Sequence, residues 1–202
     1  MVYIIDYGLG NLGSIQNMIK RVGGESKIID NPNLLMNPTK IILPGVGAFD
    51  TGMKKLNENN WLSVLNNEVL VNKIPVLGIC LGMQLMTNSS EEGNLKGLGW
   101  IDANVKKFFF DSNSYKIPHM GWNRVKVAKD SFLFDSTESN KFYFVHSYYV
   151  ETNNPSDNLL YSNYGNEFVS AFQKDNIIGL QFHPEKSHKF GINLFNKFIN
   201  QY

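Results

Sequence analysis

The sequence predicts an α/β fold with a central, mostly parallel β-sheet, helices on both faces and an added antiparallel segment. Three observations support this class. Short apolar runs alternate with segments of helical periodicity through the first hundred residues. These runs are apolar enough to be buried on both faces, as parallel strands are. Beyond about Trp100 the apolar runs are separated by turn residues instead of helices, which favours antiparallel strands.

The N-terminal part contains the first strands and the first helix. Val2–Asp6 is a short apolar run, and the turn-rich stretch Tyr7–Asn11 follows it. A helix is predicted next, ending at Gly23-Gly24, because apolar residues recur at helical spacing at Ile15, Met18, Ile19 and Val22. Further strands are predicted at Lys27–Asp30 and Ile41–Leu43.

A second helix and a buried strand lead to the only cysteine of the chain. The helix is marked by Trp61, Leu62, Leu65 and Val69. The strand includes Ile74–Leu77, and another helix is expected from Met83 to Ser89. Later strands are predicted at 101–110, 123–128, 142–145, 169–173 and 177–182, before a C-terminal helix over Phe195, Phe198, Ile199 and Tyr202.

Composition narrows the class of protein. The chain has 202 residues, of which 43% are hydrophobic and 18% charged, so we expect a single domain over 1–202, although the length also allows two small ones. The net charge of +1 indicates no nucleic-acid partner, and no apolar run approaches the roughly 20 residues that span a membrane. One cysteine and no signal-peptide pattern favour a cytoplasmic protein.

Cys80 is the strongest candidate for a catalytic residue. It lies in Gly78-Ile79-Cys80-Leu81-Gly82, between a predicted strand and a predicted helix. This pattern is typical of a nucleophile elbow, in which the small residues permit a tight, strained turn. A lone cysteine is often only a small buried hydrophobic residue, but the flanking glycines favour the nucleophile. A helix N-terminus would also favour the thiolate.

His183-Pro184-Glu185 supplies the two other groups of a nucleophilic triad. The tripeptide follows an apolar run, and by itself it could be an ordinary polar turn. A histidine near Cys80 can take its proton and return it to the leaving group, while a carboxylate orients the ring. We prefer His183 over the three other histidines because it lies at a strand end beside a carboxylate; the others are His119, His146 and His188.

Pro44–Gly47 is a candidate oxyanion loop. Spacing alone favours an ordinary loop, but its glycines would let a backbone N–H point at a developing negative charge. We predict that the amides of Val46 and Leu81 form the oxyanion hole. Because sites form at the carboxyl ends of parallel strands, four features should gather at one sheet edge, namely Asn11, Pro44–Gly47, Cys80 and His183.

The motifs together resemble a known family. The cysteine elbow and His183-Pro184-Glu185 resemble the triad-type (class I) glutamine amidotransferases, whose fold is flavodoxin-like. Five further stretches resemble the glutaminase subunits of imidazole glycerol phosphate synthase, in the same order and over essentially the whole chain: Asp6–Leu12, Leu43–Phe49, Pro118–Asn123, Tyr143–Tyr149 and Gln181–Ser187.

The resemblance implies a substrate and the residues that bind it. Cys80 would attack the side-chain amide of glutamine, His183 would protonate the departing ammonia, and water would hydrolyse the glutamyl thioester. The family match implies that glutamine is bound by Gly47, Gln84, His146, Ser147 and Tyr148. From the sequence alone, Gln84 could be a polar residue of a helix face, and the other residues could form an ordinary loop and strand end.

The resemblance also implies a partner. In this family ammonia passes to a (β/α)8-barrel cyclase, which forms a heterodimer with the glutaminase and makes imidazole glycerol phosphate and an aminoimidazole carboxamide ribonucleotide in histidine biosynthesis. Asn11, Trp122 and Lys186 match positions that lie towards the cyclase. Trp122 is a typical interface anchor, although a core position is the alternative. We expect the chain to be slow or inactive alone and to be activated by its partner.

Other functions remain as alternatives. Gly97–Asp102 departs from the apolar-Pro-Gly ending that is usual in the histidine-pathway proteins. Glu185–Gly191 also resembles paralogues that supply ammonia for the amidination of a surface-polysaccharide sugar. A cysteine peptidase, a thiol chaperone or a non-catalytic protein of the same fold is a more remote reading. The histidines and the cysteine show no metal-ligand spacing, and Gly8-Leu9-Gly10 lacks the register of a dinucleotide-binding motif, so we expect no metal and no cofactor.

Overall fold

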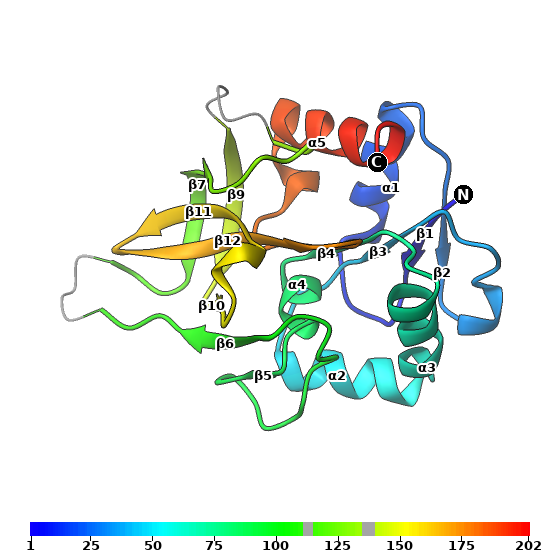
Figure 1. The fold of residues 1–202 in the computed structure, drawn as a ribbon, viewed down its shortest axis with the longest axis horizontal. Helices are drawn as coiled ribbons and strands as arrows, with labels where there is room; N and C mark the ends of the chain where they lie inside the picture. Colours follow the sequence, from blue (N-terminus) through cyan, green and yellow to red (C-terminus); the bar gives the residue numbers. More distant parts are fainter. Residues whose placement is uncertain (111–114, 135–139) are drawn as a thin grey trace.

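A parallel sheet forms the centre of the molecule in the computed structural model, which describes residues 1–110, 115–134 and 140–202 (Figure 1). Its strands lie in the order β2-β1-β3-β4-β13, and each is parallel to its neighbours. The bounds are Val2–Ile5 for β1, Ser26–Ile29 for β2, Lys40–Leu43 for β3, Val76–Ile79 for β4 and Ile177–Leu180 for β13.

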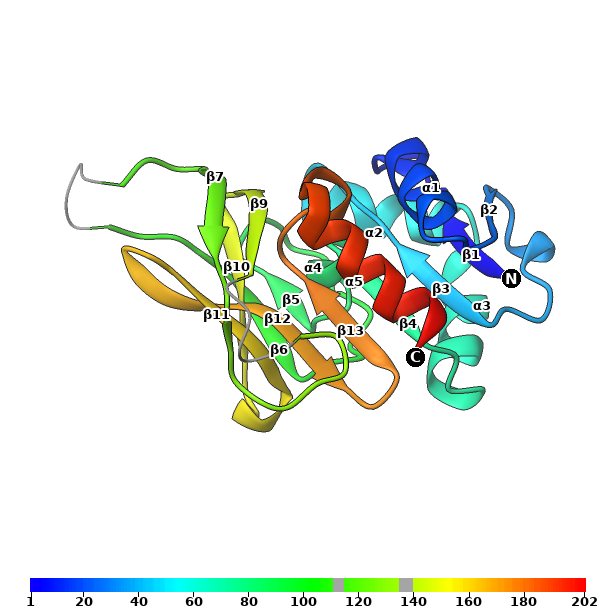
Figure 2. The same ribbon diagram turned by 90° about the horizontal axis from the view of Figure 1, so that it is seen from above.

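Helices cover both faces of this sheet. Helices α1 and α5 pack side by side on one face, as Figure 2 shows from above. Helices α2, α3 and α4 lie on the opposite face (Figure 1). The bounds are Leu12–Arg21 for α1, Phe49–Glu58 for α2, Trp61–Asn66 for α3, Leu81–Leu85 for α4 and His188–Asn200 for α5. A π-helical turn, η2 (Asn67–Val71), continues α3, and the 3-10 turns are η1 (Pro32–Leu34), η3 (Pro155–Asp157) and η4 (Pro184–Lys186).

Two apolar layers hold the helices against the sheet. Alternate residues of a strand point to opposite faces, so Val2 and Ile4 of β1 pack in the layer beneath α1 and α5. Tyr3 and Ile5 pack in the other layer, with α2 and α3. Because apolar layers cover both faces, β1, β4 and β13 are buried at every position and β3 at every position after Lys40, and the sequence prediction of a doubly covered sheet is confirmed.

The second half of the chain forms the antiparallel part. Strand β12 pairs antiparallel with β13 and extends the sheet towards β10 and β6, while β11 pairs with β12 and β8. The short strand β5 pairs parallel with β6. Strands β7 and β9 form a separate antiparallel ribbon. The bounds are Ser89–Ser90 (β5), Ala103–Lys107 (β6), His119–Arg124 (β7), Lys126–Val127 (β8), Lys141–His146 (β9), Tyr148–Thr152 (β10), Asn158–Tyr164 (β11) and Asn166–Lys174 (β12).

Two sequence predictions about helices need correction. Helix α2 was not expected, although its buried residues Phe49, Gly52, Met53 and Leu56 follow helical spacing. The helix predicted from Met83 to Ser89 is present but shorter: it begins at Leu81 and ends at Leu85, and Ser89 belongs to β5. The backbone leaves the helix at Thr87, whose hydroxyl donates to the Gln84 carbonyl.

The parallel topology places the ends of β1, β3, β4 and β13 at one edge of the sheet. The loops that follow β3, β4 and β13 carry Val46, Cys80 and His183, and these three residues line one cavity. Asn11 follows β1 at the same edge but does not line the cavity. In the part of the chain that the structure describes, every helix is too short or too polar to cross a membrane.

Candidate active site

The elbow at Cys80 is a strained turn enforced by close backbone packing. Cys80 has a φ angle of +54°, a conformation that costs a non-glycine residue energy. A Cβ atom at Gly82 would lie 1.8 Å from the carbonyl oxygen of Leu43, and one at Gly78 would lie 2.9 Å from the carbonyl oxygen of Gly82. Only glycine fits at these two positions, which explains the small residues on either side of the cysteine.

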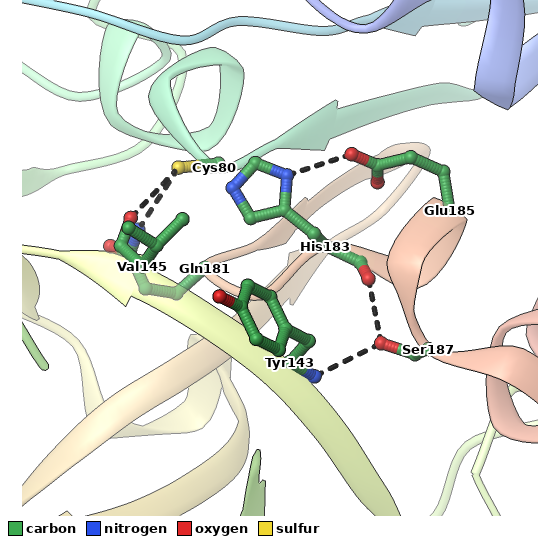
Figure 3. Close-up of polar contacts among 7 residues, drawn as sticks. All are labelled: Cys80, Tyr143, Val145, Gln181, His183, Glu185 and Ser187. Carbon is green, nitrogen blue, oxygen red and sulfur yellow. Dashed lines mark hydrogen bonds and ion pairs between the residues drawn. The ribbon is translucent and has the colours of Figure 1, made fainter. Parts of the chain in front are cut away.

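His183 and Glu185 form a buried ion pair beside the elbow. The Nδ1 atom of His183 lies 2.8 Å from Oε1 of Glu185, and both side chains are 1% exposed. The other ring nitrogen, Nε2, is buried, has no hydrogen-bond partner among the described residues and faces Cys80 (Figure 3). The three side chains therefore lie in the order thiol, imidazole, carboxylate.

The surroundings of His183 favour its charged form. Burial of the imidazole lowers the pKa of His183, but its interactions with Cys80 and Glu185 raise it more, to about 10 from the ordinary 6.5. These two neighbours therefore favour an imidazolium, which would carry a proton on Nε2 towards the cysteine. The arrangement can both stabilise a thiolate and deliver a proton to a leaving group.

One backbone hydrogen bond and two bonds through the Ser187 hydroxyl attach His183 to strand β9. The hydroxyl of Ser187 donates to the His183 carbonyl (2.6 Å) and accepts from the amide of Tyr143 (3.0 Å), as Figure 3 shows. The amide of His183 donates to the Tyr143 carbonyl at 2.8 Å. Ser187 was not recognised as a site residue from its pattern, because a serine after a turn is common and its contact with β9 spans 44 residues.

Cys80 and His183 line a cavity of about 480 Å³. The sequence-predicted residues that also line it are Val46, Gly47, Leu81, Gln84, His146, Ser147 and Tyr148. Sequence reasoning missed Ala48, Glu92, Pro118 and Val145. No cluster of three or more metal-ligating side chains occurs in residues 1–110, 115–134 and 140–202.

Tyr7 holds the candidate oxyanion loop, Pro44–Gly47, in place. The hydroxyl of Tyr7 donates to the Pro44 carbonyl at 2.6 Å, and burial raises the pKa of that hydroxyl so that it stays protonated. Within the described residues, neither the Val46 amide nor the Leu81 amide donates a hydrogen bond to the protein. Both residues line the cavity, so their amides stay the candidates for an oxyanion hole beside Cys80.

Glu92 contributes a carboxylate to the cavity. Its Oε2 atom accepts from the amide of Phe49 at 2.8 Å, at the N-terminus of α2. Asp50 holds the neighbouring segment by accepting from the amides of Asn94 and Leu95. Glu92 is fixed in place by these contacts, and an acidic residue so oriented can bind a cationic group of a ligand.

A second pair of histidines lies at the cavity. His119 and His146 face each other across the β7–β9 ribbon, with Nδ1 of His119 2.9 Å from Nε2 of His146. Nδ1 of His146 is 2.7 Å from the Tyr148 carbonyl, and Nε2 of His119 is 3.3 Å from the amide nitrogen of Asn123. Because a carbonyl only accepts, His146 carries its proton on Nδ1. Its Nε2 atom then accepts from Nδ1 of His119, and Nε2 of His119 accepts from the side-chain amide of Asn123.

This histidine pair is neutral. Burial lowers the pKa of His119 to about 4 and that of His146 to about 3. Both ring nitrogens of His146 are occupied by protein groups, so its side chain has no free atom for a substrate. If His146 binds glutamine, as predicted, it must do so through its backbone. Its imidazole instead holds the Tyr148 carbonyl at the start of β10.

The predicted interface residues lie outside the cavity. Trp122 is 46% exposed, and its ring stacks on His188 at 5.6 Å and meets Tyr143 edge-on. The Nζ atom of Lys186 lies 5.9 Å from the centre of the Tyr143 ring. The core alternative for Trp122 is therefore wrong. Asn11 is not part of this aromatic surface, but α1, which it precedes, contacts η4.

A family model and full-length relatives assign the chain to the same protein family. The model for "Glutamine amidotransferase class-I" matches residues 3–201. The chain is 55% identical over all 202 residues to the imidazole glycerol phosphate synthase subunit HisH 2 of Methanococcus maripaludis, with both chains covered completely. It is 47% identical over 203 residues to subunit HisH of Leptospira interrogans, covering 99% of this chain and 100% of that one.

Solved structures agree on the fold. A crystal structure of a glutamine amidotransferase superposes with a TM-score of 0.75 at 17% identity and covers 98% of each chain. The structure of PurLQS from Thermotoga maritima gives a TM-score of 0.72 at 16% identity, covering 98% of this chain and 97% of that one. On the family match and the full-length relatives, the chain belongs to the class-I glutamine amidotransferases and, within them, to the HisH family.

Proposed function

We propose that this chain hydrolyses glutamine to glutamate and ammonia at Cys80 and delivers the ammonia to a (β/α)8-barrel cyclase in histidine biosynthesis. The observation that carries the chemistry is the order of Cys80, His183 and Glu185, with the thiol and the imidazole lining the same cavity as Val46 and Leu81. The histidine pathway rests on the HisH relatives. We place the reaction in the cytoplasm, where the single thiol stays reduced.

The first half of the reaction forms a thioester. The Cys80 thiolate attacks the side-chain carbonyl carbon of glutamine, and the carbonyl oxygen becomes an oxyanion that accepts from the amides of Val46 and Leu81. The tetrahedral intermediate then collapses, the carbon–nitrogen bond breaks, and Nε2 of His183 gives its proton to the leaving nitrogen. The products are ammonia, a glutamyl thioester and a neutral His183 held in orientation by Glu185.

The second half hydrolyses the thioester. Neutral His183 takes a proton from water, and the resulting hydroxide attacks the thioester carbon. Collapse of the second tetrahedral intermediate breaks the carbon–sulfur bond and releases the thiolate and glutamate, whose new carboxyl group gives its proton to solvent. His183 is an imidazolium again, so the starting ion pair is restored. The raised pKa of His183 suits this state, because the thiolate and the imidazolium stabilise each other.

The cavity supplies groups for the rest of the glutamine molecule. Gln84 uses its amide nitrogen within the protein, so its Oε1 atom is the one that can accept from the substrate. Gly47, Ser147 and Tyr148 line the cavity and offer backbone groups. Glu92 is the carboxylate that can pair with the α-ammonium of glutamine. Glu92→Gln should therefore raise KM for glutamine more than it lowers kcat.

The aromatic surface made by Trp122, Tyr143, Lys186 and His188 is the proposed docking site of the cyclase, and Asn11 lies beyond it at the same sheet edge. An exposed tryptophan stacked on a second ring is a typical interface anchor. The surface shares Tyr143 with the hydrogen bonds that hold His183, so docking can act on the triad. A docked cyclase would also shield the ammonia from water on its way to the second active site. This matters because ammonium, which forms in water, has no lone pair with which to attack the cyclase substrate.

The test is the glutaminase rate of the purified chain, alone and with a histidine-pathway cyclase and its ribonucleotide ligand. We expect low activity alone, strong stimulation by the cyclase, and complete loss in Cys80→Ala without loss of cyclase binding or of synthesis from added ammonia. Trp122→Ala should weaken binding of the cyclase. A Cys80→Ala chain that still hydrolysed glutamine would contradict the nucleophile.

The same assay separates the alternatives. The stretch from Glu185 to Gly191 also resembles paralogues that serve surface-sugar amidination, and this is the second candidate function. A folded chain that the histidine-pathway cyclase does not stimulate, but that a barrel protein from a surface-sugar pathway does, would assign it there. Hydrolysis of a peptide without hydrolysis of glutamine would indicate a peptidase.

A further inference from the structure

Gln181 is a buried polar residue that neither the triad nor the pocket lining accounts for. It follows β13, two residues before His183, and is completely inaccessible to solvent. Its Nε2 atom lies 3.9 Å from Sγ of Cys80 (Figure 3), and its Oε1 atom lies 3.0 Å from Nε2 of Gln84. A buried primary amide needs partners at both ends, and here one of them is the nucleophile.

The surrounding hydrogen bonds determine which end of the Gln181 amide faces the sulfur. The carbonyl of Tyr148 only accepts, so Gln84 must turn its nitrogen towards it, at 3.2 Å. That same nitrogen faces Gln181, which must therefore present its oxygen to Gln84. The amide nitrogen of Gln181 is left pointing at Cys80 as a donor. The Tyr148 carbonyl is itself held by His146.

The donor matters most when Cys80 loses its proton. Sγ has two described hydrogen-bond neighbours, the Val145 carbonyl and the Gln181 amide, each at 3.9 Å (Figure 3). A thiol can donate to the carbonyl, but a thiolate has no proton to donate and can only accept. Helix α4 has only five residues, so its dipole adds little. The Gln181 amide is then the neutral donor beside the charge.

We propose that Gln181 is the hydrogen-bond donor that stabilises the Cys80 thiolate, both before it attacks glutamine and when it leaves the thioester. The inference deepens the proposed glutaminase function and rests on it for its catalytic meaning. Gln84 and the Tyr148 carbonyl are positioning groups that orient the Gln181 amide. The step moves no atoms beyond those already described, because Gln181 gives a hydrogen bond and keeps its proton.

The test replaces the donor and measures the reactivity of the sulfur directly. Gln181→Met keeps a similar volume without an N–H group. Cys80 is the only cysteine, so the pH dependence of its alkylation by iodoacetamide, followed by mass spectrometry on the full chain, reports one thiol. We expect the midpoint of alkylation to rise by about one pH unit, and the rate below that midpoint to fall about tenfold. With the partner present, kcat should fall about tenfold while KM changes little.

Two further variants make the result specific. Gln173→Met makes the same replacement on β12, outside the cavity, and should leave the alkylation profile unchanged. Gln181→Glu keeps the shape but offers a carboxylate, and should move the midpoint further in the same direction as Gln181→Met. The titratable groups that face the sulfur or its cavity are intact in all three variants: Tyr7, Glu92, His146, His183 and, behind His183, Glu185.

The outcomes are distinct. A folded Gln181→Met chain with an unchanged alkylation midpoint would overturn the inference, even if its activity fell, because Gln181 would then serve only the packing. If Gln181→Met does not fold, Gln181→Leu, which also lacks an N–H group, decides by the same midpoint. Alkylation needs neither glutamine nor a partner, so a raised midpoint in a chain that does not hydrolyse glutamine would support the thiolate donor and reject the proposed function.

Discussion

Two buried histidine sites border the same cavity and have opposite electrostatics. His183 faces a carboxylate and a thiol, and its pKa rises to about 10. His146 faces another histidine and a backbone carbonyl, and its pKa falls to about 3. Both rings are almost completely buried, so burial alone does not explain the difference. The partner groups decide which histidine is charged.

The two histidine sites also differ in what they can do, namely proton transfer and positioning. The charged histidine has a free Nε2 atom towards the cysteine and can transfer a proton. The neutral pair has no free ring nitrogen, because each one is paired with a neighbour. Such a closed chain of hydrogen bonds can hold Tyr148 in place but cannot move a proton without breaking. We therefore expect changes at the two sites to affect kcat and KM differently.

The largest expected effect follows from removing the carboxylate behind His183. Glu185→Gln keeps the size of the side chain but removes the charge that holds the imidazolium. We expect kcat for glutamine to fall by about 10²- to 10⁴-fold, as for loss of the orienting carboxylate in other triads. The measurement is the steady-state glutaminase rate with the partner present. Glu167→Gln, at an exposed position of β12, is the matched control, and equal activity of the two variants would refute the role of Glu185.

The next effect is a loss of stability in acid, caused by the neutral pair. The pKa values of His119 and His146 are lower in the folded chain than the ordinary 6.5, so between about pH 4 and 6.5 the unfolded chain binds more protons. Their contribution is complete above pH 6.5 and is lost as the pH falls towards 4, at roughly 1.4 kcal/mol per pH unit for each histidine.

Urea unfolding of the wild type and of a His119→Gln/His146→Gln double variant, between pH 4 and 7, tests this. Subtracting the two curves removes the contribution of the carboxyl groups, which titrate in the same range. The wild type should lose stability more steeply in acid than the variant. Parallel curves would mean that folding does not lower the pKa values of the two histidines.

A smaller effect on stability and on KM is expected when the hydrogen bonds of the His119–His146 pair are removed by an uncharged side chain. His146→Leu leaves the Tyr148 carbonyl without its imidazole donor and Nδ1 of His119 without its acceptor. Each unsatisfied buried group costs about 1–3 kcal/mol of stability, and the loosened strand end should raise KM for glutamine about tenfold with a smaller change in kcat. An unchanged KM would show that Tyr148 does not need this support. The kinetics are to be measured beside a denaturation curve, so that loss of folded protein is not taken for weak binding.

The smallest effect on stability is expected at Asn123, where the hydrogen bonds of the histidine pair end. Asn123 donates to His119 at 3.3 Å and also to the Asn163 carbonyl at 2.8 Å. Asn123→Ala should cost about 0.5–1.5 kcal/mol of unfolding free energy, the usual value of a hydrogen bond, and should leave kcat unchanged. A loss of activity as large as that of His146→Leu would mean that the pair transmits strain from the surface.

The parallel half, and the meeting of Cys80 with His183 and Glu185, could be predicted from sequence because their signals are local. The strand before Cys80, the small residues around it and His183-Pro184-Glu185 each lie within a few consecutive residues. Helix α2 was missed although its pattern was equally local, because Gly52 interrupts it; the structure shows that Leu85 of α4 packs at about 3.0 Å from where a Cβ of Gly52 would be.

The contacts that tune the site could not be predicted, because they join distant parts of the chain. His119 and His146 are 27 residues apart and meet only through the register of the β7–β9 ribbon. Gln84 and Gln181 are 97 residues apart and meet only when β13 lies beside β4. A single sequence shows that such residues are polar, but not that they are buried together.

The most direct test of the account is the protonation state of the histidines themselves. An imidazole ¹⁵N NMR titration of the labelled full chain, assigned with His119→Gln and His183→Gln, reads each ring separately. We predict that at pH 7 His183 carries protons on both nitrogens, while His119 and His146 are neutral with their protons on Nδ1. A neutral His183 at pH 7, or a His146 that titrates near 6.5, would contradict the claim that partner groups set the charge.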